Sequence, residues 1–415
     1  MEGIILEWGG MLLRWVHIIT AIAWIGSSFY FMHIDAALKP LPRVRNAADG
    51  ELWEVHGGGF YHVQKYLVAP EQLPKELIWH KWESYSSWIT GFFLLIWVYY
   101  VSAEVYLIDP AVQKISVGLA AFIGIASLAL GWLVYNALCN SPLAKNDVTL
   151  AATGFAFIMF MAWFFQQVFS ARGAFIHTGA LMATMMTGNV ALVIIPNQSK
   201  VIDALMRGEA PDPKYGKIGK QRSTHNNYLT LPVIFLMISN HYPLSYSSPY
   251  AFIVVGLVLV SGALIRHFYN ERHAGRGDHW WCWPVAMIAM LLAIYISMPQ
   301  AAAGRAFLGL GDMPEVKPVA GLPKAPAEVA DIVTGRCSMC HAREPVWQGI
   351  HTAPKGVLLD SPEMIERWRH EIIVHAGLTR AMPPNNLTEI TGDERRILRN
   401  WGSSASGQKQ SQLNP

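Results

Sequence analysis

Cysteine is scarce in this sequence, and its scarcity excludes a disulfide-stabilised scaffold. The 415 residues include only four cysteines, too few to hold a chain of this length together through disulfides. Cys139 and Cys282 are interpreted as buried thiols. The other two lie close together in the stretch "GRCSMCHAREP", so their chemistry has to be inferred from their spacing.

Charge is scarce as well. Charged residues make up only 15% of the chain, the formal net charge is +3, and 52% of the residues are hydrophobic. The weak and scattered positive charge gives no basic surface for nucleic acid, so no nucleic-acid partner is expected. No G-x-G-x-x-G fingerprint of a flavin or nucleotide site occurs. The mean hydropathy of +0.26 instead predicts a membrane protein surrounded by lipid.

Eight apolar runs are candidates to cross a hydrocarbon core of about 30 Å, which takes about 20 helical residues. They cover residues 11–32, 88–107, 115–138, 149–169, 175–195, 228–240, 250–268 and 280–298. The sixth is the least secure, because it is short and contains Pro232. The first lacks the basic start and the cleavage site of a signal peptide, so we interpret it as a retained helix.

Lysine and arginine are unevenly distributed between the two sets of loops. Sixteen lie in the loops after the first, third, fifth and seventh runs when Arg266, at the end of the seventh run, is included, whereas the opposite loops hold only Lys114 and Arg172. Because positive residues stay on the cytoplasmic side, both termini are expected in the periplasm or its equivalent. The Cys-x-x-Cys-His stretch has the pattern that attaches haem c. An odd number of spans would place it in the cytoplasm, where covalent haem c is not normally assembled.

The composition changes after the last apolar run and divides the chain into four parts. Residues 1–299 form the eight-span membrane domain, and residues 300–327, rich in Pro, Ala and Gly, are expected to be a tether. The composition predicts a small helical module in residues 328–405 and a flexible tail in residues 406–415. The fold class is therefore all-α, a polytopic membrane helix bundle with a C-terminal soluble domain.

The stretch around Cys337 carries the pattern that attaches haem c covalently. Cys337 and Cys340 are one helical turn apart, so both thiols can reach the vinyl groups of one porphyrin while His341 ligates the iron. A zinc site would need a second pair of ligands, and no other cysteine lies in the module. The sequence therefore predicts that residues 328–405 are a cytochrome c domain.

The second axial ligand of the iron is expected to be Met382. It precedes Pro383 and Pro384, whose fixed φ angles would keep its loop stiff. The alternatives are His351, His370 and His375. The segment "TGDERRILRNWGS" is expected to close the module as an amphipathic helix with its apolar side chains facing inward.

Five segments resemble a known family. They are "RWVHIITAIAWIGSSFYFMHID", "VHGGGFYHVQKY", "WHKWESYSSWITGF", "MTGNVALVIIPNQ" and "STHNNYLTLPVIFLMISNHYP", in this order and ahead of the Cys-x-x-Cys-His module. Together they are similar to the bacterial membrane-bound urate hydroxylases, integral-membrane urate oxidases fused to cytochrome c. The resemblance implies oxidation of urate to 5-hydroxyisourate, with water as the oxygen source and cytochrome c as the acceptor, and therefore no hydrogen peroxide.

Given such a substrate, the stretch "ELWEVHGGGFYHVQKYLVAPEQLPKELIWHKWE" offers candidate catalytic residues. His56, His62 and His80 carry imidazoles that could remove a proton from urate, and the glycine run could let the backbone approach a flat ligand. A glycine turn at the membrane surface is the alternative reading. Further candidates to hold urate are Gln166, Gln167, Arg172, Asn226 and Asn227.

Histidines in the apolar runs are candidate ligands of haem b. His17, His177 and His241 fall at the expected periplasmic ends, and His33, His225 and His267 toward the cytoplasm. If urate binds on the cytoplasmic side, its electrons must cross about 30 Å, which calls for such a carrier. A pocket on the periplasmic side would remove this need, and interfacial, hydrogen-bonding histidines are the other interpretation.

Electrons are expected to leave haem c for a downstream acceptor, a soluble cytochrome c or a terminal oxidase of the respiratory chain. A second functional hypothesis is a non-enzymatic, membrane-anchored cytochrome that relays electrons from quinol.

Overall fold

The computed structural model describes most of the chain. The residues described are 2–40, 50–66, 76–109, 112–300, 302–310, 324–348, 350, 352–378, 382–383 and 386–411. Helices account for 74% of the structure, which confirms the expected all-α class. Arg43, Arg45, Lys75, His351 and Pro384 lie outside the described residues.

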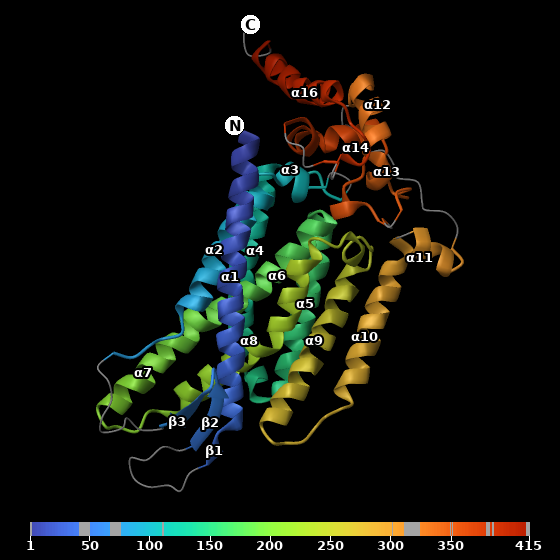
Figure 1. Cartoon of the computed structure of the whole chain (residues 1–415). Coiled ribbons are helices and arrows are strands. Elements are labelled where there is room, and N and C mark those ends of the chain that lie inside the picture. The colour runs from blue at the N-terminus through green and yellow to red at the C-terminus, as the bar shows by residue number, and fades with distance from the viewer. Residues whose placement is uncertain are drawn as a thin grey trace.

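Each of the eight apolar runs lies in a helix, and the helices pass alternately up and down one bundle (Figure 1). Apolar runs of this length favour helices, because a helix satisfies its own backbone hydrogen bonds where no water is present. The helices are α1 (Glu2–Ala37), α2 (Trp82–Leu95) continued by η1 (Ile96–Tyr100), α4 (Val117–Asn140), α5 (Asp147–Val168), α6 (Ala171–Gly188) continued by η3 (Asn189–Ile194) and α7 (Ile195–Met206), α8 (Pro213–Ser239), α9 (Ala251–His273) and α10 (Cys282–Ser297).

Among the described residues, five helices are long and apolar enough to cross a membrane. These are residues Trp8–Ala37, Val117–Asn140, Asp147–Val168, Ala171–Met206 and Ala251–His273. The other three runs differ from them for separate reasons: α2 passes into the π-helical turn η1, α8 is polar in its first half, and α10 has only 16 residues. The five helices support a membrane protein, and eight crossings stay a prediction.

Helix α8 is continuous through Pro232, the residue that made its run the least secure in the sequence. Gly262 of α9 makes room for the ring, since a Cβ at residue 262 would lie 2.7 Å from Pro232 Cδ. The helix also begins well before the apolar run, at Pro213. The polar first half of α8 therefore extends the short apolar segment to the end of the bundle.

A small antiparallel sheet stands at one end of the bundle, which we call the hairpin end. Its strands are β1 (Lys39–Pro40), β2 (Gly50–His56) and β3 (Gly59–Lys65). His56 pairs with Gly59, so Gly57 and Gly58 alone form the turn, with φ angles of 59° and 79°. Two positive φ angles are what a tight hairpin turn requires. The turn thus accounts for these two glycines without a ligand.

The C-terminal module stands at the opposite end of the bundle, which we call the module end (Figure 1). It is built from α12 (Ala327–Arg336), α13 (Ser338–His341), η6 (Pro354–Gly356), α14 (Pro362–Arg367), α15 (Arg369–Ile372), η7 (Ile373–Leu378) and α16 (Gly392–Ser411). Helix α11 (Ala302–Phe307) occupies the start of the segment expected as a tether, and residues 311–323 lie outside the described residues.

Helix α16 has the inward apolar face that its sequence predicts. Leu398 and Trp401 are buried, and Ile397 packs against the same core. The Thr391 backbone N–H donates to the Glu394 carboxylate (2.6 Å), and the Glu394 N–H donates to the Thr391 hydroxyl (3.2 Å), a capping box that fixes the start of the helix. The helix continues to Ser411, into the segment expected as a flexible tail.

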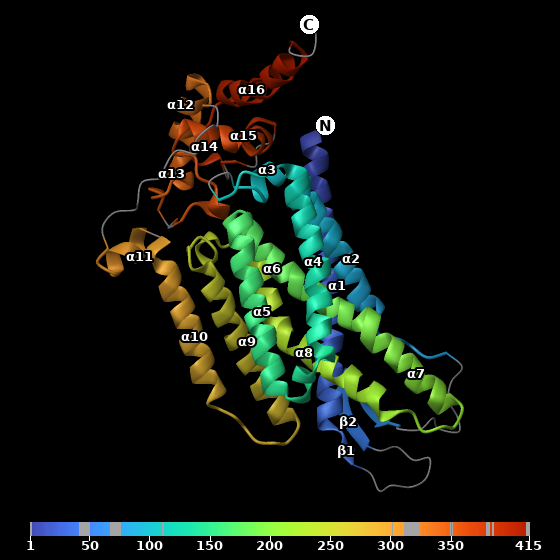
Figure 2. The same cartoon turned by 180° about the vertical axis from the view of Figure 1, so that it is seen from behind.

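Two contacts join the module to the bundle beside α3 (Ala103–Tyr106), which lies beneath the module in both views (Figure 2). Arg367 Nη1 lies 3.3 Å from Asp109 Oδ1, and both side chains are largely shielded from solvent. The ring of Tyr106 meets the indole of Trp368 edge to face, with centroids 6.2 Å apart. The module is therefore docked directly on the bundle.

Candidate functional site

A cavity of about 330 Å³ lies inside the bundle, and we call it the inner cavity. Its walls are mostly apolar and come from α1, α2, η1, α4, α6 and α8, with Trp88 and Phe92 stacked 5.1 Å apart on one side. Four polar residues at or near its module end line it: Arg14, His17, Asn240 and His241. An apolar cavity of this size with few convergent polar groups is typical of a small-molecule site.

His17 is held in one tautomer by the neighbouring helix. Its Nδ1 donates to the Ser87 carbonyl oxygen at 3.0 Å, which leaves Nε2 without a proton. The ring lies directly on Gly91, where a Cβ would come within 2.8 Å of His17 Cε1. Glycine is therefore required for this approach of α1 to α2, and the fixed imidazole can accept a proton from a ligand through Nε2.

Two arginines concentrate positive charge at the module end of the inner cavity. Arg14 lines it. Arg172 is 8% exposed and lies behind the wall, with its guanidinium 4.6 Å from the centre of the Tyr106 ring and its Nε donating to Asn240 Oδ1. Within the described residues neither forms an ion pair with a carboxylate, and Arg172 Nη1 is buried without an acceptor. The charge therefore favours an anionic ligand.

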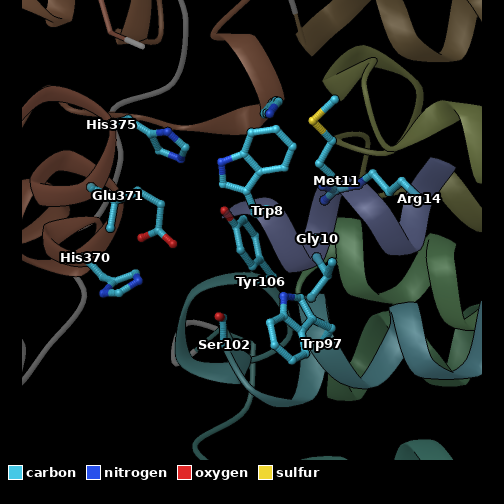
Figure 3. A pocket seen from close by; sticks show the side chains of 13 residues that line it. Trp8, Gly10, Met11, Arg14, Trp97, Ser102, Tyr106, His370, Glu371 and His375 are labelled. Carbon is cyan, nitrogen blue, oxygen red and sulfur yellow. The ribbon is translucent and has the colours of Figure 1, made fainter. Parts of the chain in front are cut away.

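A second cavity, of about 390 Å³, lies between the bundle and the module, and we call it the interface cavity (Figure 3). The bundle contributes Trp8, Gly10, Met11, Arg14, Trp97, Val98, Ser102 and Tyr106, and the module contributes Lys355, His370, Glu371, Val374 and His375. Arg14 and Val98 also line the inner cavity. The two cavities therefore adjoin each other at Arg14.

Glu371 faces the bundle across the interface cavity. Burial raises the pKa of this carboxyl to about 7, against the smaller opposing effect of a hydrogen bond from the Tyr106 hydroxyl. One of its oxygens, Oε2, is buried without a donor. Burial therefore favours the protonated, neutral form of this carboxyl, so the cations around it are only partly balanced.

The module provides the residues that haem c needs. Cys337 and Cys340 are free thiols on one turn, where the backbone N–H of His341 donates to the Cys337 carbonyl at 2.9 Å. His341 Nδ1 donates to the Val357 carbonyl oxygen at 3.1 Å, which orients the ring and leaves Nε2 for iron. Burial lowers the pKa of His341, so the imidazole is neutral, the form that ligates a metal.

Two further observations agree with haem c. Trp368 Nε1 is a buried donor without an acceptor, a group of the kind that a haem propionate would satisfy. Among the described residues, no three His, Cys, Asp or Glu side chains are grouped to hold a metal ion. The zinc alternative for Cys337 and Cys340 therefore finds no additional ligands in that part of the chain.

Met382 lies in the same core as Cys337 and is held by its backbone. Its N–H donates to the His375 carbonyl (2.8 Å), and Arg395 Nη1 donates to the Met382 carbonyl (2.9 Å). The side chains of His370 and His375 line the interface cavity instead (Figure 3). The geometry therefore favours Met382 as the second axial ligand over these two histidines.

Arg395 was not singled out in the sequence, although it positions the Met382 loop. Only 9% of its surface is exposed, and it donates to the carbonyls of Ala376 and Met382 and to Asn386 Oδ1. The sequence feature that indicates burial of Arg395 is its place in α16, three residues before the buried Leu398 and hence on the same face of the helix.

The histidines considered as haem b ligands are not brought together as one set. His17 and His241 line the inner cavity. His177 is fully buried, with Nδ1 on the Gly173 carbonyl and Nε2 on the Tyr100 hydroxyl, so both of its nitrogens are engaged. His225 and His267 hydrogen-bond to Tyr135 and Tyr228, and His33 faces Glu54 and His273.

His56, His62 and His80 stand at the hairpin end, on the exposed surface. His62 stacks on Trp53, with centroids 4.1 Å apart, and its Nε2 lies 2.7 Å from Glu51 Oε2. His80 pairs with Glu83 at 2.9 Å. None of the three lines the inner cavity or the interface cavity.

The amides considered as contacts for urate have structural partners. Asn226 hydrogen-bonds to Asn189 and to the Met186 carbonyl, Asn227 accepts from Arg266, and Gln166 accepts from the Phe252 N–H. Gln167 is exposed. Of that set, only Arg172 lies beside the inner cavity.

The family described as urate oxidase N-terminal matches residues 3–297. The chain belongs to this family. The matched segment of the urate oxidase family contains the whole bundle and every residue that lines the inner cavity, and it ends before the module. No curated protein and no solved structure matches the chain. The family indicates an oxidoreductase that acts on urate.

Proposed function

We propose that the protein hydroxylates urate in the inner cavity. Urate and one water give 5-hydroxyisourate, two protons and two electrons. The electrons pass to haem c and then to a downstream acceptor, a soluble cytochrome c or a terminal oxidase of the respiratory chain. The observation that carries the proposal is the docking of the Cys-x-x-Cys-His module on the end of the bundle where the inner cavity gathers its arginines.

Different residues of the inner cavity bind urate and accept its proton. The guanidinium of Arg14 holds the urate anion, and the apolar face of Trp88 and Phe92 supports the flat ring. His17 Nε2 accepts a proton from urate or from the attacking water. Cys337, Cys340, His341 and Met382 would hold haem c, which when bound would accept the electrons one at a time.

We also propose that the module faces the periplasm and that the bundle lies in the bacterial inner membrane. Lysines and arginines gather at the hairpin end, where the structure places the loops after α1, α7 and α9. Positive residues favour the cytoplasmic side. The inner cavity would then be reached from the periplasm, the side of the acceptor.

Urate should be consumed without oxygen uptake. Under anaerobic conditions the purified protein should show the reduced haem c absorption band on addition of urate, because haem c is the proposed acceptor. The measurement is the optical spectrum together with a peroxide assay in air. Stoichiometric hydrogen peroxide would contradict the proposal, and reduction by quinol but not by urate would support the electron relay instead.

Haem b stays a prediction, and the pyridine haemochrome assay tests it because b-type and c-type haems differ in band position. A substrate site at the module end removes the long electron path that called for haem b. Of the histidines considered as haem b ligands, His17 and His241 share the inner cavity; haem b ligated by them would occupy the place proposed for urate. We therefore expect loss of any b-type band in His17→Ala and in His241→Ala. A fully active preparation with haem c alone would end this prediction.

A further inference from the structure

The interface cavity has the size and the flat walls of a site for a planar heterocycle. At about 390 Å³ it is slightly larger than the inner cavity and falls in the range of small-molecule sites. Trp8, Trp97 and Tyr106 supply aromatic surface from the bundle side, and 58% of the Trp8 surface is exposed (Figure 3). Aromatic rings stack on flat ligands with little loss of their own freedom.

Its charged groups come from both domains and are mostly cationic. Arg14 belongs to the bundle, whereas Lys355 belongs to η6 of the module. Among the described residues that line the cavity, Glu371 is the single carboxyl, and the Tyr106 hydroxyl donates to it. The excess of positive charge selects for an anion.

The interface cavity adjoins the inner cavity. Arg14 and Val98 line both cavities. A ligand can therefore stay in contact with the Arg14 guanidinium while it passes from one cavity to the other. The far wall is fixed by the ion pair between Arg367 and Asp109. Half of the site therefore exists only while the module is docked.

We propose that the interface cavity is a second binding site for a planar anionic heterocycle, completed by the C-terminal module, through which urate reaches the inner cavity and its product leaves. The inference rests on the proposed function for the identity of the ligand. It adds a site that the family match does not cover, since one wall lies beyond residue 297.

Equilibrium dialysis of labelled urate against the full-length protein tests the proposal. Haem c is kept reduced with ascorbate and oxygen is excluded, so that urate binds without turnover. Two molecules per chain are expected in the natural protein. Lys355→Met should weaken the second site about tenfold, because one charge-assisted contact is lost, and Trp8→Ala, on the opposite wall, should weaken the same site.

Lys324→Met is the matched control, because Lys324 belongs to the same module, is 75% exposed and pairs with Glu363 away from the cavity. It should bind two molecules with natural affinity. The haem c spectrum shows that each variant is folded, and hypoxanthine, which is neutral at pH 7, should bind the second site weakly.

A single bound urate in the natural protein would overturn the inference, and so would an equal effect of Lys355→Met and Lys324→Met. Two bound molecules without any oxidation of urate would leave the second site standing and contradict the proposed function. Oxidation of urate by a protein that binds a single molecule would support the proposed function and contradict the second site.

Discussion

Arg14→Met should lower kcat/KM for urate by about 100-fold or more, because the negative charge of urate would then be buried without a partner, a loss of about 3 kcal/mol. Arg14 lines the inner cavity from α1, and Arg172 lies behind the wall at the same end. Arg14→Lys keeps the charge without the two-pronged geometry and should recover part of the activity. Steady-state kinetics with an artificial electron acceptor measure the change.

Arg207→Met is the control for this variant, since Arg207 is an exposed arginine at the hairpin end that pairs with Glu209. It should retain natural activity. If Arg14→Met oxidised urate at more than half the natural rate, the inner cavity would not be the substrate site.

Met382→Ala should leave haem c attached but remove its second axial ligand. Cys337, Cys340 and His341 are the residues proposed to hold the porphyrin, and none of them depends on Met382, so the haem content should not change. Loss of the thioether should abolish the Fe–S charge-transfer band of the oxidised protein and lower the reduction potential. Electron transfer from urate should slow accordingly.

Met339→Ala serves as the comparison, because Met339 lies inside the attachment motif and its carbonyl, not its sulfur, is engaged, by the N–H groups of Val346 and Trp347. It should keep the band. A band retained in Met382→Ala would show that another side chain ligates the iron.

The sequence predicted the helices because their signals are local. Apolar runs of span length and the amphipathic pattern of α16 need no knowledge of distant residues. A glycine turn was one interpretation of "LWEVHGGGFYHVQ", but the strands β2 and β3 beside it were not predicted, although the stretch carries the alternation and the glycine pair of a tight hairpin.

The cavities could not be predicted in the same way. Arg14, Ser87, Ile176 and His241 line one cavity but are far apart in the chain. Arg14 and His17 carry no motif that distinguishes them from other polar residues in a span. His177 looked equivalent to His17 in the sequence, yet only the fold shows that both its nitrogens are already engaged. The motif for attachment of haem c could be recognised in the sequence because Cys337, Cys340 and His341 are sequence neighbours, and the attachment itself stays a prediction.

Helix α1 carries Arg14 and His17, yet it is the least buried of the five described helices that are long and apolar enough to cross a membrane. None of the residues in its apolar window is buried, whereas fully buried side chains such as Phe165, Leu181 and Leu236 belong to α5, α6 and α8. The packing that holds the bundle together therefore depends less on α1 than on these three helices. Substitutions on the cavity face of α1 can change substrate preference at little cost in folding, so this helix is where natural variation or directed evolution can alter the reaction most freely.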